Sequence, residues 1–426
     1  MPEAKKLSNN LRTILVPFAG TEAATLMVMI KVGSRYETPG LNGASHFIEH
    51  MMFKGTKKRP STLSISKELD SVGASYNAFT GKSYTGYYAK VPAENFALAV
   101  DLLHDMIFQS LYAPVEMARE RKVIIEEINM YEDNPLMHIE DLLEEKLLEG
   151  NSVGWNIAGN RQTMETMKRS EIIKFRDTYY TPARVVLAAA GKLPANVEKI
   201  LEAKFGKVKG GQESPEFLPY ANVGCPCCWP KAAVQFKDNQ QIQLAFGFLS
   251  PGLRDEKKDL LADVLATILG GTMSSRLFIS VRERKGLAYF VRAAQGSYED
   301  IGVFSIRAGL DKSRLPLASK VIFDEIRSIK KKGPTTAELK LAKSYLKGKM
   351  KLALEDSSHR ADFYARQELL LDKIETPESY YKKIEKISLK EIQAMANEIL
   401  SEDKMTVAGI GPFKNEKSLM KEVGLV

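Results

Sequence analysis

The stretch from His46 to Thr56 reads HFIEHMMFKGT and contains two histidines four residues apart, His46 and His50, with Glu49 between them. On a helix, residues four apart share one face, so both imidazoles can reach a single metal ion. Glu49 lies three residues after His46, close enough to that face to contact a water on the metal without being a ligand. This order, the reverse of His-Glu-x-x-His, is a known catalytic zinc pattern. The stretch therefore predicts a helix that ends at Gly55 and carries part of a zinc site.

A second helix, predicted from Pro114 to about Tyr131, supplies acidic side chains. At about 100° per residue, Glu127 lies about 20° from Glu120, on an apolar stripe that should be buried, whereas Glu126 points away. That stripe also contains Val123, Ile124, Ile128 and Tyr131. A catalytic zinc ion with two histidine ligands needs one carboxylate and an open position, and Glu127 supplies the carboxylate. We assign Glu120 to orienting a ligand. The alternative is that these glutamates pair with Arg or Lys.

The other three histidines are weaker candidates for metal binding. His104 falls in an amphipathic helix, His138 follows Asn134-Pro135 and could approach the site, and His359 stands in a polar context. A lone histidine is more often structural or exposed than a ligand. We therefore expect the zinc site to be completed by a carboxylate and by no further histidine.

Composition and charge narrow the class of protein. The chain has 426 residues, of which 44% are hydrophobic, which is enough for two domains with separate cores. No stretch has the ~18 apolar residues of a membrane span, and the N-terminus resembles neither a secretory signal nor a transit peptide. We expect a cytoplasmic protein, with a processed mitochondrial form left open. The net charge of +8 is dispersed and no nucleic-acid module is recognisable, so we expect neither a nucleic-acid nor a membrane partner.

The cysteines do not change this expectation. The sequence contains three of them, all within four residues: Cys225, Cys227 and Cys228. They are too few for a disulfide framework, which fits a reducing compartment, and a closed structural zinc site would need a fourth ligand. We interpret them as part of a linker between domains.

The order of predicted elements is similar in the two halves. The first half contains strands at 11–18 and 23–32, the helix at 46–53, strands within 75–91, helices at 93–110, 114–131, 140–148 and 170–179, and a strand at 185–190. The second half contains a strand at 242–248, helices at 256–269 and 275–284, strands within 289–308, long helices and a strand at 405–410. We predict an α+β fold of two similar domains, each a mixed or antiparallel sheet packed with helices. The zinc-binding domain spans 1–212, the linker 213–231 and the second domain 232–426.

HFIEHMMFKGT and the stretch from Glu120 to Glu127, ERKVIIEE, resemble the pitrilysin/insulinase family of zinc peptidases, in particular its half-length processing-peptidase branch. The resemblance covers nearly the whole chain. Glu127 lies 77 residues after His50 and seven after Glu120, as do the family's third ligand and its helper glutamate. The resemblance implies one zinc ion per chain, bound by His46, His50 and Glu127, with Glu49 as general base. It also implies that the two domains form half of a clamshell.

The resemblance extends to substrate binding. Asn77, Ala78 and Phe79 are similar to the family's edge strand, to which a peptide adds as a further β-strand. Arg282 and Tyr289 resemble residues that contact the substrate from the non-catalytic half, across an enclosed chamber. From the residues alone, the first stretch reads as an ordinary strand, and the second as a helix end followed by a strand.

The function implied is zinc-dependent hydrolysis of peptides or small unfolded polypeptides inside an enclosed chamber. A half-length chain that carries the zinc motif together with Arg282 and Tyr289 favours a homodimer, and a heterodimer with an inactive relative is the alternative. Two other functions stay open. One is a presequence-specific processing peptidase that works with a different partner subunit. The other is a non-catalytic scaffold related to the family.

Overall fold

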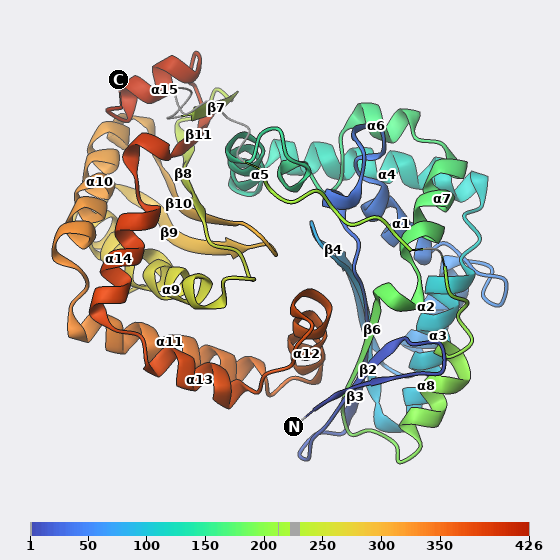
Figure 1. The fold of residues 1–426 in the computed structure, drawn as a ribbon. Helices are drawn as coiled ribbons and strands as arrows, with labels where there is room; N and C mark the ends of the chain where they lie inside the picture. The colour runs from blue at the N-terminus through green and yellow to red at the C-terminus, as the bar shows by residue number, and fades with distance from the viewer. Residues whose placement is uncertain (1, 212, 222–230, 426) are drawn as a thin grey trace. The chain divides into compact units, whose positions relative to one another are not determined.

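The computed structural model describes residues 2–211, 213–221 and 231–425 (Figure 1). These residues form two compact units, each built on one β-sheet. Unit 1 comprises Met1–Ile128, Trp155–Leu218 and Met350–Pro377. Unit 2 comprises Asn129–Gly154, Pro219–Lys349 and Glu378–Val426. The predicted fold class, two similar α+β units with mixed sheets, is confirmed.

The sheet of unit 1 has the strand order β1-β2-β6-β3-β5-β4. β2 and β6 run parallel, and the other neighbouring pairs are antiparallel. β3 and β6 are almost continuously apolar and buried, because both faces of the sheet are covered at its centre. The strands are Ala4–Lys6 (β1), Arg12–Pro17 (β2), Ala23–Ile30 (β3), Ser75–Thr80 (β4), Thr85–Pro92 (β5) and Val185–Gly191 (β6).

The sheet of unit 2 repeats this topology. Its order, β7-β11-β8-β10-β9, corresponds strand by strand to β2-β6-β3-β5-β4, and its one parallel pair, β7 and β11, corresponds to β2 and β6. The edge strand β9 is thus the counterpart of β4. The strands are Lys231–Phe236 (β7), Gln241–Ser250 (β8), Ala288–Ser297 (β9), Gly302–Asp311 (β10) and Thr406–Gly411 (β11).

Helices cover both faces of the sheet in unit 1 (Figure 1). On one face lie α1 (Ala44–Met52), α2 (Thr62–Asp70), α3 (Phe96–Gln109), α7 (Arg169–Tyr179) and α8 (Val197–Phe205). Leu26 and Val28 of β3 point into this main core. The opposite face is covered by α12 (Ser357–Leu371), where Thr25 Oγ1 of β3 lies 2.7 Å from Ser357 Oγ. Successive side chains of β3 point to opposite faces of the sheet, so alternate residues pack against the main core and against α12.

Unit 2 is layered in the same way. One face of its sheet packs against α9 (Glu256–Ala266), α10 (Leu315–Lys332) and α14 (Leu389–Ile399). The other face is covered by α5 (Pro135–Leu147), whose Ile139 and Leu143 pack on Ala245 and Ala408 of the sheet. The remaining α-helices are α4 (Pro114–Asp133), α6 (Arg161–Thr166), α11 (Thr336–Ala353), α13 (Pro377–Glu385) and α15 (Glu416–Glu422).

The two units exchange one helix each. α5 comes from the first half of the chain but packs in unit 2, and α12 comes from the second half but packs in unit 1. The units therefore differ from the contiguous domains 1–212 and 232–426 expected above. Helical periodicity identifies the apolar face of such a helix, but it carries no information about which sheet that face will cover.

Within the segment expected as a linker, 213–231, residues 214–217 contact the rest of unit 1. Arg184 donates to the carbonyl oxygens of Ser214 and Pro215, and the guanidinium of Arg35 lies 3.5 Å from the centre of the Phe217 ring. The three cysteines lie outside the described residues. No helix among the described residues combines the length and the apolar composition needed to cross a membrane.

Candidate metal centre

Helix α1 presents the two histidines, and a buried carboxylate holds its start. Glu37 accepts hydrogen bonds from the backbone N–H groups of Gly43 and Ser45, both at 2.7 Å, and from the Asn42 amide at 3.0 Å. These N–H groups at the helix start have no acceptor within the helix, and the positive end of the helix dipole favours an anion there. Gly43 has φ of 98°, a conformation that glycine adopts without strain.

Three donor atoms from α1 and α4 converge. Oε2 of Glu127 lies 3.8 Å from Nε2 of His46 and 3.4 Å from Nε2 of His50. Ligand atoms at the usual distances from a tetrahedral zinc ion are about 3.4 Å apart. Two imidazoles and one carboxylate are also a donor set that catalytic zinc sites use, so the residues fit this ion. In the described part of the chain, no other His, Cys, Asp and Glu side chains gather in a metal-binding arrangement.

Glu120 connects His50 to a lysine. Its Oε1 lies 2.7 Å from Nδ1 of His50, and its Oε2 lies 2.6 Å from Nζ of Lys54. Glu120 is only 4% exposed, so both carboxylate oxygens need partners. With Nδ1 of His50 donating to Glu120, Nε2 of His50 faces Glu127 and the metal position, and it can offer its lone pair to a metal ion once it has lost its proton. Lys54 balances the charge of Glu120 on its far side.

Burial and mutual interactions shift the pKa values of the three donors. Burial and the charge of His50 lower the pKa of His46 to about 4. Burial would also lower the pKa of His50, but hydrogen bonds with Glu120 and Glu127 outweigh it and raise the pKa to about 9. The hydrogen bond with His50 lowers the pKa of Glu127. At neutral pH, one proton therefore sits on His50 between two carboxylates.

Glu49 lies beside the three donors without joining them. It is half-buried on α1, and one of its oxygens, Oε2, accepts a hydrogen bond from the hydroxyl of Thr80 on β4. Burial raises the pKa of Glu49, although the Thr80 hydrogen bond acts in the opposite direction. A carboxylate in this position can exchange a proton with a molecule at the metal position.

The residues predicted to bind substrate fall in both units. Asn77, Ala78 and Phe79 lie on the edge strand β4 of unit 1, in the strand that ends beside Glu49. Arg282 and Tyr289 belong to unit 2. Arg282 is exposed on a π-helical turn (Phe278–Glu283), and Tyr289 is 49% exposed on the edge strand β9. The structure thus groups the first three residues with the metal donors in unit 1 and places the other two in unit 2.

The helix-stripe prediction was wrong at Val123, which is 51% exposed. The buried face of α4 is centred near Ile124 and Ile128, which leaves Val123 at its border. His104 packs against aromatic rings instead of approaching the donors. Sequence reasoning also missed several residues that hold the site in place: Glu37, Lys54 and Thr80. Lys54 could have been suspected, because it follows His50 by only four residues.

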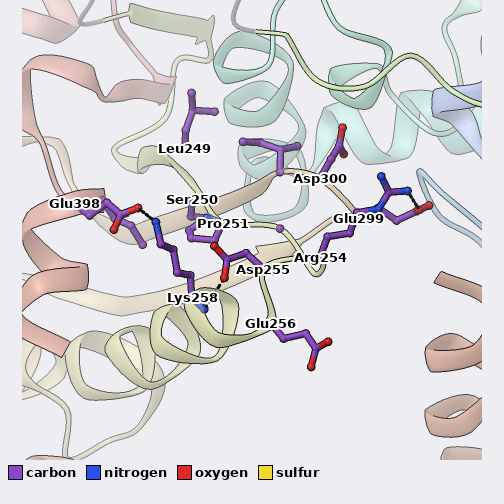
Figure 2. Close-up of a pocket in the computed structure, with 13 residues that line it drawn as sticks. Leu249, Ser250, Pro251, Arg254, Asp255, Glu256, Lys258, Glu299, Asp300 and Glu398 are labelled. Atoms are coloured by element: carbon purple, nitrogen blue, oxygen red, sulfur yellow. Dashed lines mark hydrogen bonds and ion pairs between the residues drawn. The ribbon is translucent and has the colours of Figure 1, made fainter. Parts of the chain in front are cut away.

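A cavity of about 780 Å³ lies in unit 2, and its lining residues differ in chemistry from the metal donors of unit 1 (Figure 2). Its basic side chains are engaged in ion pairs, Arg254 with Glu299 at 2.9 Å and Lys258 with Glu398 at 2.7 Å. Its carboxylates are not among the metal-binding groups found in the described residues. The converging donors of unit 1 are therefore the stronger candidate for a catalytic centre.

Comparisons with known sequences give consistent matches over nearly the whole chain. Residues 13–161 match the family described as Insulinase (Peptidase family M16), and residues 166–346 match the Peptidase M16 inactive domain. The chain is 36% identical over 416 residues to the "Uncharacterized zinc protease YmxG" of Bacillus subtilis, covering 96% of this chain and 98% of that protein. It is 32% identical over 412 residues to an "Uncharacterized zinc protease" of Rickettsia bellii, covering 96% and 97%.

Solved structures share the fold. A protease from Helicobacter pylori superposes with a TM-score of 0.90 at 24% identity, covering 97% of this chain and 99% of that one. A chain of Complex III2 from Candida albicans superposes with a TM-score of 0.84 at 17% identity, covering 99% of each. The same fold therefore occurs in a protease and in a chain of that complex, so the fold alone does not decide the activity.

The choice of Glu127 as the third ligand can be tested against its neighbour. Glu127→Gln should weaken zinc binding by more than the roughly 10–100-fold seen for changes around a ligand, because a charged ligand is lost. Glu126→Gln is the matched control, since Glu126 is exposed one residue away, and should bind zinc like the wild type. Competition with a chelator gives the two dissociation constants. Equal weakening in both variants would contradict the assignment.

Zinc binding should also depend on pH. A zinc ligand must be unprotonated, so zinc has to displace the proton of His50, whose pKa is about 9 in the metal-free protein. The raised pKa means that the proton competes below pH 9, and affinity should rise with pH up to that value. Uptake at pH 7 should release about one proton per chain. Calorimetry in buffers of different ionisation enthalpy measures this release, and an affinity unchanged from pH 6 to 8 would refute it.

Proposed function

Because the chain belongs to peptidase family M16, the insulinase family, we propose that it is a zinc-dependent endopeptidase. Its expected substrates are peptides or small unfolded polypeptides. The single observation that carries the proposal is the convergence of His46, His50 and Glu127 with Glu49 beside them, supported by relatives that are named zinc proteases. Three ligands with an adjacent carboxylate that is not a ligand are what a hydrolytic zinc centre requires.

Each side chain of the metal centre has its own role in peptide hydrolysis. A zinc ion bound by the three donors would supply a Lewis acid and lower the pKa of a water toward 7. Glu49 accepts a proton from the attacking water and returns it to the departing amine nitrogen. Glu120 orients His50, and Lys54 keeps Glu120 in place.

The edge strand β4 suits an extended substrate. Its backbone is paired with β5 on one side, and it ends at Thr80, next to Glu49. A peptide that adds to its open edge as a further strand would be held by backbone hydrogen bonds, with little dependence on its sequence. In this proposal Asn77, Ala78 and Phe79 contact the substrate. Such recognition selects for an extended conformation, which an unfolded polypeptide can adopt.

We propose that the active assembly is a homodimer. Arg282 and Tyr289 are exposed in unit 2, and each chain also carries a complete set of metal donors. In a symmetric pair, each zinc site would receive Arg282 and Tyr289 from the other chain, inside a chamber closed by the two copies. A heterodimer with an inactive relative, as a presequence-specific processing peptidase, is the alternative within this class.

A non-catalytic scaffold is the alternative from another class, since a chain of Complex III2 has the same fold. A scaffold has no need for a general base beside three metal donors. An endopeptidase should lose its activity when the carboxylate of Glu49 is removed, whereas a scaffold has no peptidase activity to lose.

Glu49→Gln should abolish cleavage of a quenched fluorescent peptide while zinc stays bound. The amide keeps the shape of the side chain but cannot accept the proton, and loss of a general base costs about 10²–10⁴-fold in kcat. Zinc content is measured by mass spectrometry on the same preparations, with Glu126→Gln as the control. A wild-type protein that binds zinc but cleaves no peptide would favour the scaffold, and turnover by Glu49→Gln would remove Glu49 as the base.

The homodimer can be tested by mixing two defective chains. Glu49→Gln lacks the base but keeps Arg282, and Arg282→Ala lacks the arginine but keeps the base. In a mixed dimer the Arg282→Ala chain faces an intact Arg282, so one of its two sites should work. Equal amounts should reach about one quarter of wild-type activity after random exchange. Activity no higher than that of the separate variants, with a monomeric mass in solution, would contradict the proposal.

A further inference from the structure

Thr80 links the edge strand β4 to Glu49. It is the last residue of that strand, opposite Thr85 of β5, and its hydroxyl donates to Oε2 of Glu49. A glutamate side chain has three torsions, and a general base acts only when an oxygen lies within hydrogen-bond reach of the proton it takes. The hydrogen bond from Thr80 occupies Oε2, so Oε1 is the oxygen that is left to accept a proton.

The same kind of hydrogen bond occurs in unit 2. Ser297 is the last residue of β9, opposite Gly302 of β10, and its hydroxyl donates to Oδ1 of Asp259 on α9. β9 corresponds to β4, and α9 follows β8 as α1 follows β3. Asp259 belongs to no metal-binding group among the described residues, so this tie between strand and helix is structural in unit 2.

Comparing the Thr80–Glu49 and Ser297–Asp259 hydrogen bonds distinguishes two possible roles of Thr80. If it only ties β4 to α1, its loss should have the same effect as the loss of its counterpart in unit 2, a small cost in stability. If it also orients the catalytic carboxylate, its loss should slow catalysis, whereas loss of the counterpart should not. The difference arises because the acceptor in unit 1 is Glu49, which stands beside the metal donors.

We propose that Thr80 is a positioning residue for Glu49. It holds the carboxylate so that Oε1 accepts the proton of the attacking water. Because Thr80 also ends the strand expected to receive the substrate, it couples the position of the base to that of the bound peptide. This inference rests on the proposed peptidase function and adds a residue to it.

Thr80→Val tests the role, since valine keeps the shape of the side chain and removes the hydroxyl. We expect kcat to fall about 10–100-fold, as for a small misplacement of a reacting group. KM should stay within about twofold, because the backbone edge of β4 is unchanged and only an interaction of the chemical step is lost. Zinc content should equal that of the wild type. Thr80→Ser, which restores the hydroxyl, should recover most of kcat.

Ser297→Ala is the matched control and should leave kcat and KM unchanged. Thermal unfolding of both variants compares the structural cost of the two hydrogen bonds. Wild-type kcat in Thr80→Val would overturn the inference, as would an equal loss of kcat in Ser297→Ala or a failure of Thr80→Ser to restore turnover. The proposed function fails separately: if Glu49→Gln retains turnover, or the wild type cleaves nothing, both proposals fall.

Discussion

Two histidines one turn apart on a helix can bind the same metal ion only if the ion lies on the helix face that both side chains share. The other residues of the site are arranged around this position. His46 and His50 direct their Nε2 atoms to the same point because α1 is helical between them. The third ligand must then come from an element that faces this point, and α4 provides Glu127. The start of α1 is in turn held by the carboxylate of Glu37. A shift of either helix would separate the donors.

Charge balance explains why acidic side chains can be buried around the site. An uncompensated buried carboxylate is costly, and a paired one is stable only if its oxygens are also hydrogen-bonded. Glu120 meets this requirement with His50 on one oxygen and Lys54 on the other. Glu127 has the two imidazoles, and Glu49 has the hydroxyl of Thr80. Each carboxylate thus has its own set of partners, although Glu120 and Glu127 share His50, and the three similar side chains can therefore have three different roles.

The sequence predicted the parts of the site that depend on local spacing. The four-residue separation of the histidines defines a helix face, and helical periodicity puts Glu127 and Glu120 on one side of α4. Contacts between distant elements could not be predicted in this way. Thr80 reaches Glu49 only because β4 packs beside α1. Lys54 can pair with Glu120 only because α4 packs against the end of α1. The order of elements predicted two similar units. The exchange of α5 and α12 could not be predicted, because it depends on which face of each sheet the other helices leave uncovered in the folded structure.

That exchange makes the two halves of the chain depend on each other for folding. Without α12 the sheet of unit 1 would expose the face of β3 that carries Thr25, and without α5 the sheet of unit 2 would expose Ala245 and Ala408. Neither half of the polypeptide therefore buries both faces of its own sheet, so the core of each unit is complete only when both halves of the chain are present.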